Sequence, residues 1–167
     1  GAGAAASIDD AAYAAAGATV GSRSDVLNGA NIILAIQGPD PESLSGFAPG
    51  AWLAAGLNPF GDRARVDAYA ALGLEALAME FMPRITRAQS MDILSSQANL
   101  SGYKAVLMAA NAYGRAFPMM MTAAGTVSAA KAFIMGVGVA GLQAIATARR
   151  IGAQVSATDV RSATKEQ

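Results

Sequence analysis

The chain has 167 residues and a mass of 16.8 kDa, enough for one domain or two small ones. Twelve Lys and Arg balance twelve Asp and Glu, so no net positive charge attracts nucleic acid, and we expect no nucleic-acid partner. Without Cys or His, the chain cannot form a disulfide, a His-based triad or a His/Cys metal site, and we expect no metal. A bound cofactor that supplies the reactivity fits this composition best.

No secretory signal pattern is present, since the first basic residue is Arg23. We expect an internal fragment of a longer protein. Residues 132–148 carry no charge over 17 positions, near the lower limit for a membrane span. Three glycines and a polar Gln143 interrupt this run, which favours a buried strand followed by a buried helix face.

The first half of the chain alternates between helical and strand-like stretches. A short helix is predicted over residues 7–17, with its N-cap in the run Ser7 to Asp10. An apolar run at 31–37 predicts a strand, closed by two prolines in the loop that follows. A strand at 51–56, a helix at 62–72 and a strand at 74–80 complete the pattern. Strand, helix and strand in this order predict a parallel βαβ unit.

Apolar residues at steps of three and four predict one long helix over residues 100–117 that links two lobes. Three consecutive Met at 119–121 and Gly125 predict a loop after it. We therefore expect a first lobe with its linking helix at residues 1–124 and a dinucleotide-binding lobe at residues 125–167.

The run 131–136 predicts a buried strand, and Gly136, Gly138 and Gly141 give the G-x-G-x-x-G spacing at its end. A helix follows, with Leu142, Ile145 and Ala146 expected on its buried face and Gly152 at its end. The next strand, at 154–159, ends in an acidic residue. Strand, glycine turn, helix, strand and acid together are the context of a dinucleotide site.

Each part of this motif has a physical role. Gly136 allows the tight turn, Gly138 lets the backbone approach a pyrophosphate, and Gly141 permits close packing of helix on strand. Asp159 would accept hydrogen bonds from the adenosine ribose and repel a 2′-phosphate, which predicts NAD rather than NADP. The alternative is a βαβ unit whose glycines serve packing alone. Arg161 could stack on adenine, neutralise Asp159, soften the discrimination against NADP, or remain solvated.

Residues 83–96 concentrate polar groups where the long helix would begin, and by spacing alone they form a helix start with an Arg/Asp pair. Besides the glycine motif, the chain contains the runs MEFMPR at 79–84, RAQSMD at 87–92, NLSGY at 99–103, RAFPMMMTAAG at 115–125 and ATDVR at 157–161. With these runs it closely resembles the NAD(H)-binding alpha component (domain I) of the proton-translocating transhydrogenases, in the alanine dehydrogenase/transhydrogenase family. The resemblance is dense from Met79 onward and thinner, but continuous, before it.

The resemblance implies an α/β fold of two Rossmann-like lobes with parallel sheets, both truncated in this fragment, and NAD(H) bound in the cleft between them. It assigns the nicotinamide end of that cleft to Arg84, Gln89, Asp92 and Ser95. Asp92 would hold Arg84, and Gln89 would orient the nicotinamide and its ribose. Contact with NAD(H) is expected from the motif residues Gly136, Gly138, Val139, Gly141, Asp159, Val160 and Arg161.

Alanine dehydrogenases use a Lys on the early strand and a His after the next one to bind and protonate the oxo acid. This sequence has neither in those places. The resemblance therefore favours direct hydride transfer from NADH to NADP⁺, with NADP(H) bound on a partner domain, a reaction that needs positioning and no general acid. An alanine-dehydrogenase-like oxidoreductase and a non-catalytic nucleotide-binding module remain the alternatives.

The implied assembly is a homodimer that joins membrane proton-channel and NADP-binding components. Such a chain would lie on the cytoplasmic side of the inner membrane and be held there through its partner subunits. The fragment alone is expected to be inactive.

Overall fold

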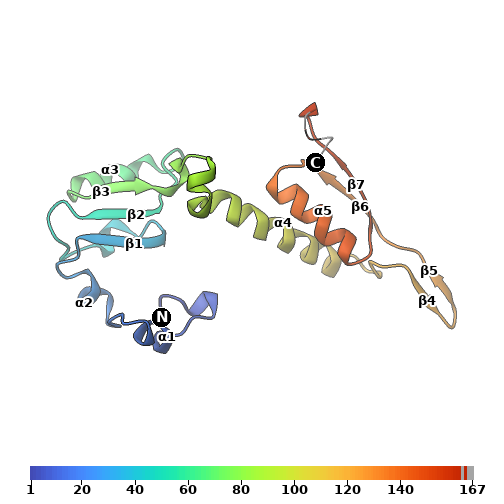
Figure 1. Ribbon diagram of the computed structural model, residues 1–167, viewed down its shortest axis with the longest axis horizontal. Helices are drawn as coiled ribbons and strands as arrows, with labels where there is room; N and C mark the ends of the chain where they lie inside the picture. Colours follow the sequence, from blue (N-terminus) through green and yellow to red (C-terminus); the bar gives the residue numbers. More distant parts are fainter. Residues whose placement is uncertain (163, 165–167) are drawn as a thin grey trace. The chain divides into compact units, whose positions relative to one another are not determined.

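The structure, a computed structural model, describes residues 1–162 and 164 and divides into two compact units, Gly1–Met91 and Asp92–Gln167 (Figure 1). Parallel strand pairs occur in both units, which confirms the predicted α/β class. The expected boundary at 124/125 counted the long helix with the first lobe as a linker. By its contacts this helix packs inside the second unit.

The first unit is built on a three-stranded parallel sheet of order β1-β2-β3. The predicted βαβ unit is confirmed as β2, α3 and β3. In chain order the elements are η1 (Ala4–Ala6), α1 (Asp10–Ala15), α2 (Arg23–Leu27), β1 (Ile32–Gln37), η2 (Pro41–Ser43), β2 (Trp52–Gly56), α3 (Arg63–Ala71), β3 (Glu75–Ala78), η3 (Met79–Phe81) and η4 (Thr86–Met91).

Local side-chain chemistry sets the helix ends of this unit. Asp62 caps α3 by accepting the Arg65 N–H at 3.1 Å, and Gly73 ends it in the left-handed region at φ 77°. The cap of α1 is Asp9, whereas Ser7 adopts a left-handed conformation before it. Helix α2, which was not predicted, begins with a capping box between Ser22 and Asp25.

The core of the first unit is one cluster of apolar side chains from α2, β1, β2, α3 and the segments beside them. Leu53, Ala55, Leu57 and Tyr69 are almost completely buried there. Leu53, Ala55 and Leu57 are alternate residues of β2 and the position after it, as expected of a strand that buries one face. Tyr69 is the contribution of α3, and it is the largest fully buried side chain among the described residues.

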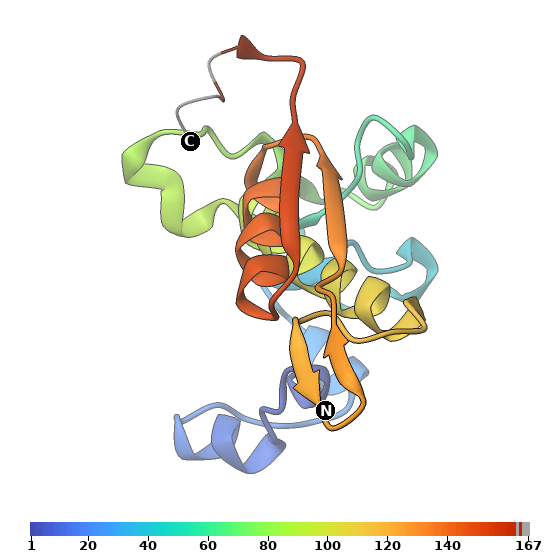
Figure 2. The same ribbon diagram turned by 90° about the vertical axis from the view of Figure 1, so that its right-hand side faces the viewer.

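The second unit contains α4 (Ile93–Ala112), β4 (Met120–Thr122), β5 (Gly125–Val127), β6 (Lys131–Met135), α5 (Val139–Arg150) and β7 (Gln154–Thr158). Figure 2 shows β6 and β7 side by side with α5 packed behind them, and the two strands are parallel. The predicted strand–helix–strand at 131–159 is therefore confirmed. Two expectations were wrong: α4 ends at Ala112 rather than at Phe117, and the Met-rich run forms the β4–β5 hairpin rather than a loop.

Close packing of α4 on α5 explains one further difference. A Cβ added at Gly102 of α4 would overlap the backbone carbonyl of Ala140, so the helices meet without an intervening side chain. The residues of α5 that are fully covered are Ala144, Thr147 and Ala148. We had expected Leu142, Ile145 and Ala146, which are only half-buried. A helix between a sheet and a second helix buries its small residues most deeply, because both neighbours approach closely there.

Among the described residues, no helix has the length and apolar character that a membrane crossing requires. The uncharged run 132–148 is divided between β6 and α5, as predicted, but the expectation that its strand is buried was wrong. Ala132 and Ile134 pack against the core that includes Ala144 and Ala148 of α5, whereas the alternate side chains Phe133 and Met135 are exposed.

Candidate functional site

The turn between β6 and α5 has the conformation that its first glycine was expected to provide. Gly136 lies in the left-handed region at φ 94°, where a side chain would be strained. Its N–H donates to the Thr158 carbonyl at 2.7 Å. The turn is thereby tied to the end of the neighbouring strand β7.

The other two glycines have different roles: Gly141 allows a close backbone contact, and Gly138 leaves the start of α5 without a side chain. A Cβ at Gly141 would overlap the carbonyl of Gly136, so only glycine lets α5 begin this close to the turn. Gly138 is the N-cap of α5 and has extended backbone with no side-chain cap. The first amides of this 12-residue helix therefore have no side-chain oxygen at the cap position, an arrangement suited to an anionic ligand.

Asp159 closes the turn from the β7 side. Its Oδ2 accepts the Val137 N–H at 2.7 Å, and its Oδ1 accepts the Arg161 N–H at 2.8 Å. The Arg161 guanidinium adds an ion pair of 3.0 Å between Nε and Oδ1. The hydrogen bonds from the Arg161 side chain and from the Val137 and Arg161 amides hold the pKa of Asp159 well below its usual range. The carboxylate is therefore charged at neutral pH.

Of the roles left open for Arg161, the structure has the one that neutralises Asp159. The Asp159 side chain is 6% exposed, and Arg161 covers it while itself 61% exposed. A pocket of about 380 Å³ adjoins the pair and is lined by Val137, Thr158 and Val160 among others. Val160 is fully exposed, and Val139 is the first residue of α5.

The predicted cofactor residues thus gather at one place, the carboxyl ends of β6 and β7 and the start of α5. This is the end of a parallel sheet at which α/β proteins bind ligands. The glycine geometry fits a pyrophosphate, because Gly138 has no side chain and α5 begins at this residue.

The second predicted set lies where the chain passes from the first unit to the second. Arg84 and Gln89 are exposed and belong to the segment that ends the first unit. Asp92 caps α4, accepting the Ser95 N–H at 3.0 Å and the Ser95 hydroxyl at 2.6 Å. The structure thus brings Asp92 and Ser95 together. The D-x-x-S spacing is typical of this cap and fits the helix start that the sequence predicts here. The role of Asp92 in holding Arg84 stays a prediction.

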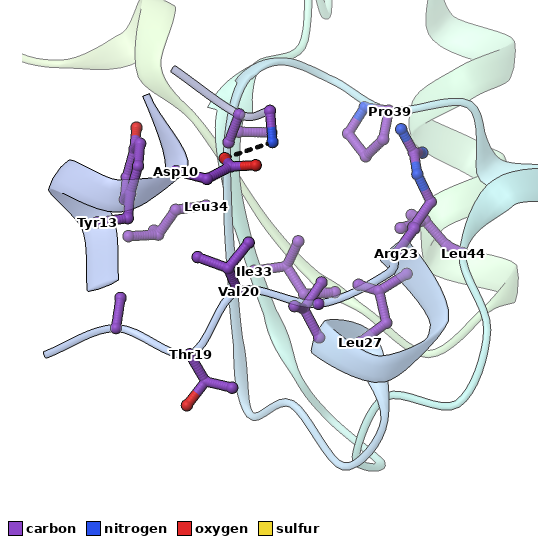
Figure 3. A pocket seen from close by; sticks show the side chains of 16 residues that line it. Asp10, Tyr13, Thr19, Val20, Arg23, Leu27, Ile33, Leu34, Pro39 and Leu44 are labelled. Carbon is purple, nitrogen blue, oxygen red and sulfur yellow. Dashed lines mark hydrogen bonds and ion pairs between the residues drawn. The ribbon is translucent and has the colours of Figure 1, made fainter. Parts of the chain in front are cut away.

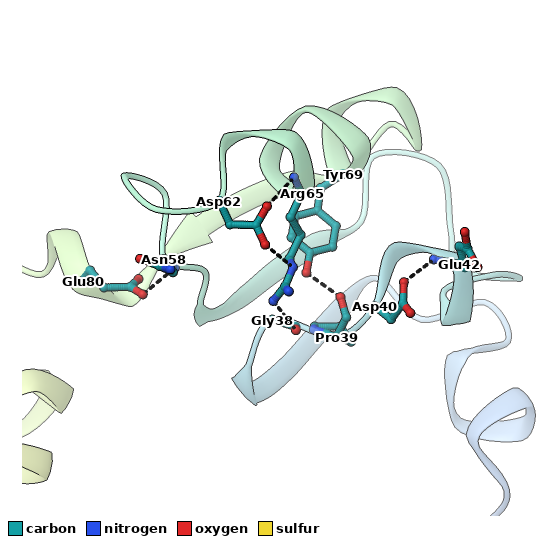
Figure 4. Close-up of polar contacts among 9 residues, drawn as sticks. All are labelled: Gly38, Pro39, Asp40, Glu42, Asn58, Asp62, Arg65, Tyr69 and Glu80. Carbon is teal, nitrogen blue, oxygen red and sulfur yellow. Dashed lines mark hydrogen bonds and ion pairs between the residues drawn. The ribbon is translucent and has the colours of Figure 1, made fainter.

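Side chains that no sequence motif had marked organise the carboxyl end of the first sheet (Figure 4). The buried Tyr69 hydroxyl donates to the Pro39 carbonyl at 2.5 Å. Arg65 pairs with Asp62 at 3.0 Å and reaches the Gly38 carbonyl. These contacts fix the loop after β1 against the start of α3.

Glu80 connects the ends of the other two strands. Its carboxylate accepts the Asn58 N–H at 2.7 Å and the Leu57 N–H at 3.1 Å, which ties the loop after β2 to the segment after β3 (Figure 4). Burial alone would raise the pKa of Glu80, but hydrogen bonds from the Asn58, Glu80 and Leu57 amides together lower it. No sequence spacing reveals this contact, because the partners are 22 and 23 residues away.

A larger pocket, of about 580 Å³, lies between the N-terminal segment and β1 in the first unit (Figure 3). Its walls are mainly apolar, with Val20, Leu27, Ile33 and Leu34 among them. The residues predicted to bind cofactor or to position it do not line this pocket. Within residues 1–162 and 164, no group of three or more acidic side chains is placed to hold a metal ion.

Comparison with known proteins identifies the family. Residues 1–101 match the alanine dehydrogenase/PNT N-terminal domain, and residues 105–167 match the C-terminal domain of the same family. The chain is 53% identical to the first part of NAD(P) transhydrogenase subunit alpha of Rhodospirillum rubrum, covering 100% of the chain and 45% of that protein. It is 50% identical to the protein of the same name from Rickettsia prowazekii, with 95% and 43% covered.

Two solved structures share the fold. A transhydrogenase crystal structure from Sinorhizobium meliloti superposes with a TM-score of 0.93 at 58% identity, covering 98% of this chain and 47% of that one. An L-alanine dehydrogenase superposes with a TM-score of 0.77 at 23% identity, covering 97% and 45%, and shows likeness of fold alone. The chain spans about half the length of the curated relatives it matches. These matches, with the glycine turn after β6, establish that the chain belongs to the alanine dehydrogenase/PNT family.

Proposed function

We propose that this chain is part of the NAD(H)-binding component of a proton-translocating transhydrogenase, and that it binds NAD(H) at the turn after β6. One observation carries the proposal: the glycine turn, the start of α5 and the Asp159 carboxylate converge at the end of a parallel strand pair. The names of the relatives at 50% identity and above support the choice of transhydrogenase within the family.

Asp159 supports a preference for NAD over NADP. Its carboxylate is charged and nearly buried at the end of β7, so a 2′-phosphate placed beside it meets a like charge. The adenosine ribose hydroxyls, in contrast, donate hydrogen bonds to such a group. Gly138 and the first amides of α5 would face the pyrophosphate.

The reaction we propose is direct hydride transfer from NADH to NADP⁺ bound on a partner domain. When bound, NADH supplies the hydride from its nicotinamide ring. Gln89 and Arg84 orient the nicotinamide end, while Asp92 and Ser95 stabilise the start of α4. These residues act by placement. No His occurs in the chain and β1 carries no Lys, which fits a reaction without a general acid.

We also propose that the component is a homodimer bound to membrane proton-channel and NADP-binding subunits, on the cytoplasmic side of the inner membrane. The β4–β5 hairpin supports an association of chains. Met119, directly before it, and Met121 within it are 64% and 85% exposed, and apolar side chains displayed in this way commonly mark an interface.

The test uses the full-length protein that contains this chain, with its partner subunits. Binding of NADH and NADPH is measured by calorimetry, and turnover is assayed with NADH plus NADP⁺ and with NADH plus an oxo acid and ammonia. We expect tighter binding of NADH, turnover with the second nicotinamide only, and a smaller NADH preference in Asp159→Asn. Equal binding of NADPH by the parent protein would refute the site, and turnover with the oxo acid would refute the reaction.

A further inference from the structure

Asp159 is saturated with hydrogen-bond donors. Besides the two backbone amides, it accepts the Arg161 Nε at 3.0 Å on Oδ1 and the Arg161 Nη2 at 3.1 Å on Oδ2. The amides of Val137 and Arg161 occupy one further position on each oxygen. A carboxylate offers about four acceptor positions in total. Every one of them therefore has a donor from the chain itself.

The two classes of donor differ in how easily they can be replaced. The amides belong to the turn and to the backbone after β7, so they are fixed with it. The guanidinium lies at the end of a side chain that is 61% exposed and can turn into solvent at little cost. It contributes two hydrogen bonds to Asp159, and the two hydroxyls of a ribose could contribute the same number.

The guanidinium also lies beside the second glycine of the motif. A Cβ built at Gly138 would stand 3.8 Å from Arg161 Nη2, and Arg161 is the side chain nearest to it. Gly138 is where the backbone is bare for phosphate. Arg161 thus lies within reach of both the acidic group that favours a free ribose and the place where phosphates approach. A guanidinium binds phosphate oxygens in a two-pronged manner that suits a 2′-phosphate.

We propose that Arg161 is a specificity-determining residue that competes with the adenosine ribose for Asp159 and gives a 2′-phosphate a cationic partner. The inference rests on the function proposed above for this site. Its consequence is that Arg161 weakens NADH binding, strengthens NADPH binding, and so limits the preference that Asp159 creates. The competition also favours release of the nucleotide, because the ion pair re-forms as the ribose departs.

The experiment measures the dissociation constants of NADH and NADPH for the full-length protein and its Arg161→Ala variant. We expect NADH to bind about threefold more tightly and NADPH about threefold more weakly, so that the ratio widens about tenfold. Arg161→Lys keeps the positive charge but loses the paired N–H donors of the guanidinium. Its ratio of NADPH to NADH dissociation constants should therefore lie between those of the wild type and Arg161→Ala. Arg150→Ala is the matched control, since it removes one exposed positive charge from the far end of α5 and should leave the ratio unchanged.

A double-mutant cycle distinguishes competition from a general change at the site. In an Asp159→Asn background the guanidinium no longer forms its ion pair, so adding Arg161→Ala should not tighten NADH binding. Weaker NADH binding in the Arg161→Ala single variant, or an unchanged ratio, would overturn the inference while leaving the nucleotide site intact. Failure of the wild-type protein to bind NADH would overturn the proposed function as well.

Discussion

The carboxyl ends of the two parallel sheets are held by different means. In the second unit the turn after β6 is held by close backbone contacts and by one carboxylate: Gly136 is bonded to Thr158, Gly141 lies against the Gly136 carbonyl, and Asp159 accepts the Val137 N–H. In the first unit a similar backbone bond joins Gly38 to Gly56, but three larger side chains, Tyr69, Arg65 and Glu80, also bind the backbone at the strand ends. The glycines of the turn after β6 have no side chains, which leaves room for a ligand there. In the first unit the side chains at the strand ends occupy the corresponding space. This difference supports the proposal that NAD(H) binds to the second unit.

The largest expected effect comes from breaking the backbone contact. Gly141→Ala places a methyl group on the Gly136 carbonyl, which should destabilise the second unit by about 3 kcal/mol or more and abolish NADH binding. Denaturant unfolding and calorimetry of the full-length protein provide the measurements. Gly138→Ala is the control, since its extended backbone accepts any residue and the added Cβ has only an ordinary contact with Arg161. It should fold normally and bind NADH about tenfold more weakly.

The second prediction concerns the segment that leads from the first unit into the second. Gln89→Asn shortens one proposed positioning side chain by a methylene group. We expect hydride transfer to fall about a hundredfold while NADH affinity stays nearly constant, as for misplacement by about 1 Å. Single-turnover transfer to an NADP analogue, with a deuterated donor, measures the chemical step. The exposed Gln97 of α4 is the matched control, and Gln97→Asn should transfer hydride at the normal rate. An unchanged rate in Gln89→Asn would remove the support for positioning.

A third prediction tests the hydrogen bonds that Glu80 accepts in the first unit. Glu80→Gln weakens two hydrogen bonds to backbone amides, and we expect a loss of about 2 kcal/mol of stability in the first unit at pH 7. Because the pKa of Glu80 is lowered from 4.5 in the folded state, its stabilisation is complete above that pH and disappears as the pH falls through the folded value. Unfolding curves of both proteins should therefore converge in acid. A constant difference between them would contradict the proposed role of the charge.

The smallest expected effect is that of Tyr69→Phe. The variant removes the hydrogen bond to the Pro39 carbonyl and keeps the packing of the ring, so it should cost about 1 kcal/mol. Burial raises the pKa of Tyr69 above 10.0, and the stabilisation by the neutral phenol is lost as the pH rises through that higher value. The difference from wild type should therefore shrink in alkali. NADH affinity at neutral pH should be the same for both proteins.

The same comparison explains how much the sequence could reveal. The geometry of the candidate site in the second unit could be predicted because its determinants are local: three glycines at fixed spacing and an acid at the end of the next strand. Tyr69 and Glu80 could not be found, because a Tyr within a helix or a Glu after a strand has no spacing that specifies its partner. The β4–β5 hairpin was missed because three Met and a Gly resemble a loop in composition. Its strand character depends on pairing across the turn.

The approach of Gly141 to Gly136 also has a mechanical consequence. Elements separated by side chains can shift when rotamers change, but here backbone meets backbone directly. The bonds from Gly136 to Thr158 and from Val137 to Asp159 extend this contact to β7. The ends of β6 and β7, the turn between β6 and α5, and the first turn of α5 therefore form one rigid group. A nucleotide bound here, as proposed above, would be held by one rigid group, so moving it relative to a partner would require the strand ends, the turn and the start of α5 to move together.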